Sequence, residues 1–230
     1  MRRLLLLAAV AAAALAAAGT AGATRECNGF QVCVPVAGPW VLVPGRAETS
    51  WQLACPKHFV VGGLDAELTT HELDLAFRAT LGSPVNPGIS TSTAAIFLGR
   101  LVAGRDPAAS FRPHIGCIPR SGGGGQRVPT AYRVVYPPGR PTTLRSSALA
   151  VRAGATRRVT RSCRAGERLV TSTDAVGFYT KRPPSRLLAR AVHVSRTSAG
   201  GRVSVTIHGG AAVRGVRAVV QLDLLCAGGA

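Results

Sequence analysis

Acidic residues, aromatic residues and long apolar runs are all scarce in this sequence of 230 residues. Only 10 Asp and Glu residues stand against 28 Lys and Arg residues, so the formal net charge is +18. Aromatic residues make up 5% of the chain and no nucleic-acid recognition motif occurs, so we do not expect sequence-specific nucleic-acid binding. After residue 18 no apolar run approaches the roughly 20 residues of a membrane-spanning helix, so we expect no transmembrane segment in the mature chain.

The usual catalytic and metal-binding motifs are missing as well. The nucleophile and metalloprotease patterns G-x-S-x-G, S-x-x-K and H-E-x-x-H do not occur, and no Cys or His residues have the close spacing of a zinc site. The glycine run 122–125 is not followed by Lys-Ser or Lys-Thr, so it does not form a phosphate-binding loop. These absences favour a protein that is not an enzyme and that needs neither a metal nor a cofactor.

The N-terminus has the pattern of a secretory signal peptide. Two arginines precede an apolar run at 4–18, and Ala21 and Ala23 occupy the two small-residue positions of a cleavage site. We therefore expect residues 1–23 to be removed and the mature chain to be secreted or held at the cell envelope; an uncleaved anchor is the alternative. Loss of Arg2 and Arg3 would leave 26 basic against 10 acidic residues, a net charge of +16. Arginine in place of nearly all lysine, with abundant Ala and Gly, is typical of a GC-rich bacterial genome.

Six cysteines in an exported chain predict three disulfide bonds. Six cysteines allow fifteen pairings. Cys55 and Cys117 are 62 residues apart and Cys163 and Cys226 are 63 apart, so the simplest pairing is 55–117, 163–226 and 27–33. The near-equal spacing also suggests an internal repeat, because residues 110–117 align with residues 219–226 with apolar residues on the face of each cysteine. Two unrelated domains with coincidental spacing are the alternative.

The rest of the mature chain alternates with period two and is interrupted by Gly and Pro turns, which predicts an all-β fold. We expect two tandem β-sandwich-like units, 24–118 and 142–230, each closed by one disulfide, with a Gly/Pro-rich linker at 119–141. In the last strand the apolar residues of 216–226 share one face, so Arg217, Gln221 and Asp223 are expected to point outward. The only fair helix candidate is 185–192, which would fit a strand equally well.

One acidic cluster falls within ten residues of an otherwise acid-poor chain and comprises Asp65, Glu67, His71, Glu72 and Asp74. Carboxylates at this density would suit Ca²⁺, or an acid–base pair of a polysaccharide hydrolase. The alternative is a solvated outer face of a β-hairpin. The remaining histidines show no metal-ligand spacing, and His114 and His208 are expected on outward strand faces.

Positive charge is concentrated in the middle and in the second half of the chain. From 107 to 166 there is no acid, and the candidate polyanion contacts, all within the second unit, are Arg152, Arg157, Arg158, Arg161 and Arg164. Such a surface attracts anionic cell-wall polymers or anionic membrane surfaces, in a salt-dependent way. The leading hypothesis is thus an exported, non-catalytic binding or structural protein. The alternative functions are a polysaccharide hydrolase and a small-ligand or inhibitor module that uses loop 82–93. The positive charge could also serve solubility alone.

Overall fold

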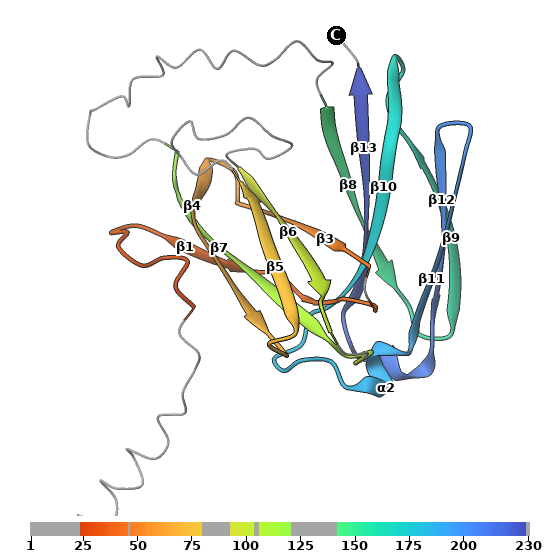
Figure 1. Cartoon of the computed structure of the whole chain (residues 1–230), viewed down its shortest axis with the longest axis horizontal. Coiled ribbons are helices and arrows are strands. Elements are labelled where there is room, and N and C mark those ends of the chain that lie inside the picture. Colours follow the sequence, from red (N-terminus) through yellow and green to blue (C-terminus); the bar gives the residue numbers. More distant parts are fainter. Residues whose placement is uncertain (1–23, 46, 80–92, 104–105, 121–141, 229–230) are drawn as a thin grey trace, which may run out of the picture.

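The computed structural model describes residues 24–45, 47–79, 93–103, 106–120 and 142–228, and its regular structure is almost entirely β-strand (Figure 1). The first half forms β1 (Val34–Ala37), β2 (Trp40–Leu42), β3 (Thr49–Ala54), β4 (Phe59–Leu68), β5 (Leu73–Ala79), β6 (Ala94–Leu101) and β7 (Ser110–Pro119). The second half forms β8 (Thr142–Val151), β9 (Ala155–Ser162), β10 (Glu167–Phe178), β11 (Val192–Ala199), β12 (Arg202–Gly209) and β13 (Ala218–Gly228). The all-β prediction is confirmed.

Helical structure within these ranges is limited to a single turn, α2 (Arg186–Ala189), and a short 3₁₀ segment, η1 (Ala211–Val213). The Ser185 hydroxyl caps α2 by accepting a hydrogen bond from the Leu188 N–H. The predicted helix is therefore present but shorter than expected, because β11 begins at Val192. No helix in the described part of the chain has the length and apolar character to cross a membrane.

A seven-stranded antiparallel sheet runs through both halves of the chain. Strand β7 pairs along one edge with β4 and along the other with β1 and β2. Strand β2 in turn pairs with β10, which continues to β13 and β8. A three-stranded sheet, β3–β6–β5, and a hairpin, β11–β12, form the other layers. Strand β9 lies beside β12, where Thr156 hydrogen-bonds His208 and Thr160 hydrogen-bonds Ser204.

Two hydrophobic cores lie on opposite faces of this long sheet. The first is enclosed between the long sheet and β3–β6–β5 and includes Trp51, Phe97 and Phe111. The second is enclosed between the long sheet and the layer of β9, β11 and β12, and includes Phe178. Strand β13 contributes to both: Val219 packs in the first core, whereas the alternate residues of the same strand, Val220, Leu222 and Leu224, pack in the second.

Strand β13 is buried on both of its faces. The prediction that Gln221 and Asp223 point outward is therefore wrong, since both side chains are buried. Strand β3 covers the face that the sequence pattern assigned to solvent. The Gln52 N–H donates to Gln221 Oε1 at 2.6 Å, and Gln221 Nε2 donates to the Gln52 carbonyl at 3.0 Å. The Gln221 side chain thus satisfies both backbone hydrogen-bonding groups of Gln52 at the place where β13 passes beneath β3.

Asp223 is the one carboxylate enclosed between these layers. The Ser50 hydroxyl donates to its Oδ2 at 3.3 Å, and Thr173 lies 2.8 Å from the same hydroxyl. Its Oδ1 is buried with no hydrogen-bond partner among the described residues. Burial disfavours the charged form, and it raises the pKa of Asp223 to about 6, because the serine hydrogen bonds offset only part of the desolvation.

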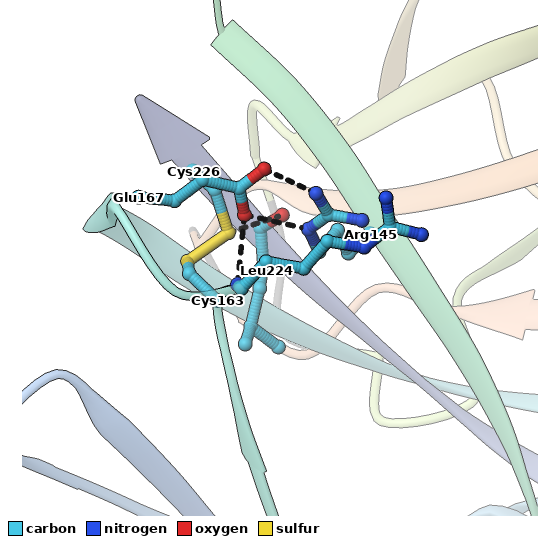
Figure 2. The surroundings of a disulfide bond; sticks show 6 residues. Arg145, Cys163, Glu167, Leu224 and Cys226 are labelled. Carbon is cyan, nitrogen blue, oxygen red and sulfur yellow. Dashed lines mark hydrogen bonds and ion pairs between the residues drawn. A yellow bond between two sulfur atoms is a disulfide. The ribbon is translucent and has the colours of Figure 1, made fainter. Parts of the chain in front are cut away.

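The three disulfides pair Cys27 with Cys33, Cys55 with Cys117 and Cys163 with Cys226, as the spacing predicted. The second links the end of β3 to β7 across the first core, and the third links the end of β9 to β13 across the second core. Each closes a loop of about 60 residues, worth roughly 4 kcal/mol in the chain-entropy account. Figure 2 shows the third bond beside an ion pair between Arg145 and Glu167.

The division into two tandem units and the internal repeat stay predictions. Strands β7 and β13 do carry the aligned residues of 110–117 and 219–226, and each ends near a cysteine that faces a core. However, β2 and β10 join the two halves in one sheet. Residues 121–141, the greater part of the expected linker, and the expected signal peptide at 1–23 lie outside the described residues.

The enclosed carboxyl of Asp223 leads to a prediction about stability and pH. Its raised pKa means that the folded chain binds a proton more tightly than the unfolded chain, so stability should fall as pH rises from about 4 to about 6 and then level off. Asp223→Asn should remove this fall and should stabilise the fold at pH 7, by up to about 3 kcal/mol. Urea unfolding at pH 4, 5, 6 and 7 would measure it. Asp74→Asn, an exposed site on β5, is the matched control.

Candidate functional site

The five residues of the predicted acidic cluster lie on different elements. Asp65 and Glu67 are on β4 in the long sheet, and Asp74 is on β5 in the three-stranded sheet. His71 and Glu72 are exposed in the turn between these strands. The structure describes no hydrogen bond or ion pair that joins any two of the five.

Two of these carboxylates already have partners in the fold. Asp65 accepts backbone N–H groups from Arg25 at 2.6 Å and from Ala66 at 2.8 Å. Glu67 Oε1 lies 2.9 Å from His114 Nε2 and 3.6 Å from an Arg112 nitrogen. Each of these carboxylates is held by its own partners within the fold, and no described contact joins the two, so they do not form the converging ligand set or the facing acid–base pair that the prediction required.

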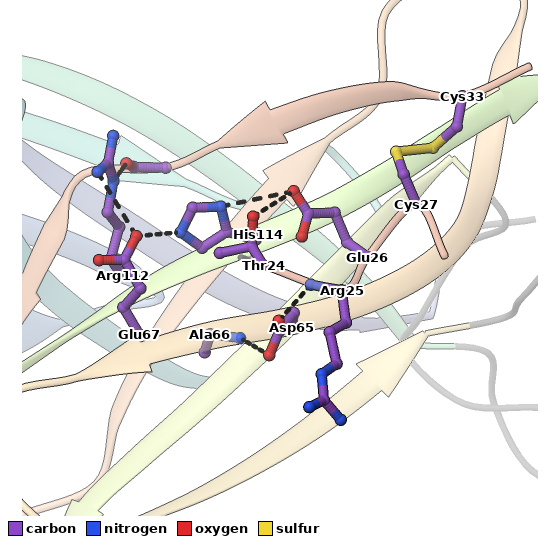
Figure 3. A network of polar contacts seen from close by, with 11 residues as sticks. Thr24, Arg25, Glu26, Cys27, Cys33, Asp65, Ala66, Glu67, Arg112 and His114 are labelled. Atoms are coloured by element: carbon purple, nitrogen blue, oxygen red, sulfur yellow. Dashed lines mark hydrogen bonds and ion pairs between the residues drawn. A yellow bond between two sulfur atoms is a disulfide. The ribbon is translucent and has the colours of Figure 1, made fainter. Parts of the chain in front are cut away.

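His114 is buried, which corrects the prediction that it lies on an outward face. The N-terminal segment covers the outer side of β4 and β7 at this position, and Glu26, itself only 3% exposed, lies 3.8 Å from His114 Nδ1 (Figure 3). The Thr24 hydroxyl donates to the same oxygen of Glu26 at 3.1 Å. A chain of polar groups therefore runs from Glu26 through His114 to Glu67 and Arg112 beneath the segment.

Sequence reasoning missed Glu26, and no local pattern would have found it. It lies next to the Cys27–Cys33 loop, and its partner His114 is on the last strand of the first half. The sequence feature related to Glu26 is a pair of glycines, Gly63 and Gly116, that face its backbone carbonyl. A Cβ at Gly63 or at Gly116 would lie 2.0 Å from the Glu26 carbonyl oxygen, so both positions require the absence of a side chain.

The predicted polyanion contacts are all exposed. Arg157, Arg158 and Arg161 lie on β9, Arg152 is in the turn before it, and Arg164 is in the turn after it. No described ion pair involves any of the five side chains, although the Arg164 backbone N–H donates to Glu167 at 2.8 Å. Their positive charge is therefore directed to solvent.

The three acidic residues of the second half make contacts within the fold and do not pair with the arginines of β9. Glu167 is paired with Arg145, whose hydrogen bond holds the pKa of that carboxyl below its usual value. Asp174 Oδ1 lies 3.5 Å from Arg196 Nε, and Asp223 is enclosed between the layers. Cys163, Glu167 and Cys226 lie close enough to hold a metal ion, but both sulfurs are bonded to each other. Little acidic charge is left to neutralise the arginines of β9.

Two of these arginines border a hollow of about 350 Å³ at the β8–β9 turn. Arg152 and Arg157 lie at its rim together with Thr156, and its apolar lining is Ala150, Val151, Ala155 and Ile207. Two arginines beside a partly apolar lining suit an anionic group attached to a less polar body. This is the place where the structure brings predicted site residues together.

A larger cleft of about 840 Å³ lies where the two halves of the chain meet. Its apolar lining combines Leu42 from β2 with Val176 from β10 and Val192 from β11, and its polar residues are Asp106, Asp174, Arg190 and His193. Its size falls within the usual range of small-molecule sites. Sequence reasoning did not find this cleft, because its walls come from segments that are far apart in the chain. The loop 82–93 that the small-ligand hypothesis invoked lies outside the described residues, apart from Thr93.

Comparison with known proteins adds no relative: no protein family, no curated protein and no solved structure matches the chain.

The glycine contact beneath the N-terminal segment leads to a prediction. Gly63→Ala should displace residues 24–27, because the new methyl group would overlap the Glu26 carbonyl, and should destabilise the fold by about 1–3 kcal/mol. Hydrogen exchange of the segment and urea unfolding would measure both effects. Gly62→Ala is the matched control, since its methyl would meet only the ends of the Ile118 and Phe30 side chains, and it should cost less. Equal behaviour of the two variants would contradict the proposed contact.

Proposed function

We propose that this chain is an exported, non-catalytic protein that binds anionic polymer outside the cell, and that the arginines around β9 make the contact. The observation that carries the proposal is the hollow at the β8–β9 turn, where Arg152 and Arg157 lie together. Their positive charge is available, because the nearby acids are paired or buried. The three disulfides agree with folding in an oxidising compartment.

The polymer would be recognised by charge and spacing. Arg152 and Arg157 would hold one anionic group of the polymer at the hollow, and the apolar lining would contact the part of the repeat unit between charges. Arg161, on the same face of β9 as Arg157, and Arg164 just beyond the end of the strand would contact further repeat units, whereas the alternation of β9 directs Arg158 to the other face. An exposed arginine near an anionic surface contributes about 1 kcal/mol, so affinity would come from several weak contacts and would fall with salt.

The proposal predicts the behaviour of a double variant, Arg152→Gln with Arg157→Gln. Binding to fluorescently labelled polyphosphate, measured by anisotropy at several salt concentrations, should weaken about tenfold or more, and the salt slope should fall by about two contacts. The matched control is Arg78→Gln with Arg120→Gln, which removes the same charge from exposed positions of the first half. If both double variants weaken binding equally, only net charge matters and the proposed site is wrong. Repeating the titration with polygalacturonate would distinguish phosphate from carboxylate polymers.

A second candidate function is the binding of a small apolar molecule in the 840 Å³ cleft. Its lining is largely apolar, and Asp106 and Asp174 are held in place by Arg186 and Arg196. A site of this size and composition would admit one ring system with its polar edge toward the carboxylates. This function is compatible with polymer binding, because the cleft and the hollow at the β8–β9 turn share no lining residue.

Indole is a suitable probe of the cleft, and saturation-transfer NMR would detect its binding. Pro107→Trp places a large ring at the mouth of the cleft without altering a core residue, and it should abolish the indole signal. Pro56→Trp, at an exposed turn after β3, is the control and should leave the signal unchanged. An indole signal that survives Pro107→Trp would exclude the cleft as the site.

A further inference from the structure

His193 and His208 lie directly opposite each other in the β11–β12 hairpin. Their ring centroids are 6.4 Å apart, and the ring planes are inclined by 24°. Both side chains are exposed. Residues Val205 and Ile207 of the same strand point into the second core, so the alternation of the strand directs His208 away from it, and His193 shares that face.

Two imidazoles in this arrangement form a chelating pair. Directly opposed residues of antiparallel strands have Cβ atoms about 4.5–5.5 Å apart, and small rotations of exposed side chains bring two ring nitrogens to about 2.0–2.1 Å from a shared ion. The strands fix the spacing of the two Cβ atoms in advance, so binding orders only the two rings. An isolated surface histidine lacks this advantage.

Thr156 on β9 supplies a second interaction that a metal site uses. Its hydroxyl oxygen lies 3.0 Å from His208 Nδ1. When the Nδ1–H group of His208 donates to this oxygen, the opposite ring nitrogen, Nε2, carries the lone pair that binds a metal. Metal-ligating histidines commonly donate their other N–H to such an outer partner, which fixes the tautomer and the ring orientation.

The surroundings restrict which ion would bind. The pair has no carboxylate ligand, and β9 carries Arg157 and Arg158 beside β12, so hard cations that need anionic oxygen ligands are disfavoured. Neutral nitrogen ligands favour the borderline divalent ions of the first transition row, and among these Cu²⁺ binds most tightly.

We propose that His193 and His208 form a two-histidine surface site for a divalent transition-metal ion, with Cu²⁺ bound more tightly than Ni²⁺ or Zn²⁺ and with Thr156 orienting His208. The metal site does not depend on the polymer-binding function, although Thr156 also lines the hollow at the β8–β9 turn. The two ring nitrogens occupy two coordination positions. The remaining positions are open to water or to an external ligand.

Titration of the disulfide-bonded chain with Cu²⁺, followed by calorimetry and by electron paramagnetic resonance, tests this proposal. The expected result is one tight ion per chain with two nitrogen ligands. His193→Ala and His208→Ala should each weaken binding at least about tenfold and remove one nitrogen from the spectrum. Thr156→Val keeps both ligands and should weaken binding by about tenfold, the lower end of outer-partner effects.

The exposed histidines of the first half provide matched controls. His71→Ala should leave both the affinity and the two-nitrogen spectrum unchanged, and so should His58→Asn, since asparagine tolerates the positive φ of 71° at this position. The proposal is overturned if either control lowers the affinity as much as the hairpin variants do, or if His193→Ala and His208→Ala retain the affinity of the unaltered chain. Wild-type affinity in Thr156→Val would overturn the role assigned to the hydroxyl. Circular dichroism of every variant confirms that each is folded, as expected for exposed positions.

Discussion

The burial of β13 on both faces is the constraint on which the rest of the structure depends. One face of this strand completes the core beneath β3–β6–β5, and the other completes the core beneath β9, β11 and β12. The second core depends on this strand most, because Val220, Leu222 and Leu224 all belong to it, whereas the first core takes only Val219 from it. Enclosing both faces of β13 also buries the polar side chains of Gln221 and Asp223. Burial of polar groups is unfavourable unless they are hydrogen-bonded. Partners on β3 satisfy Gln221 fully and Asp223 only in part.

Local patterns predicted the strand class and the cysteine pairing because both depend on information close in the sequence: period-two alternation in one case and spacing in the other. The same patterns gave wrong predictions where a segment that is distant in the sequence covers one face of a strand. Strand alternation placed both His114 and Asp223 on outward faces. In the structure the segment at 24–27 covers His114, and β3 covers Asp223. The cleft of 840 Å³ escaped notice for the same reason, since its walls come from segments that are far apart in the chain.

The distribution of charge follows from the way the acids are used. In the second half Glu167, Asp174 and Asp223 are all committed to contacts within the fold. In the first half Asp65 and Glu67 help to hold the N-terminal segment and His114. Each ion pair engages one acid together with one arginine, as in Arg145–Glu167 and Arg196–Asp174. The net positive charge of the chain is therefore carried by arginines without an acidic partner, and those of β9 are among them.

The position of β13 also sets an order of events during synthesis. The ribosome delivers β1 to β12 first, and the second core lacks Val220, Leu222 and Leu224 until residues 218–228 have been made. Cys163 cannot pair with Cys226 before that moment, whereas Cys55 and Cys117 are both present much earlier. Until β13 is added, the apolar residues of the second core lack their partner strand, and the mutual repulsion of the arginines opposes association of such incomplete chains.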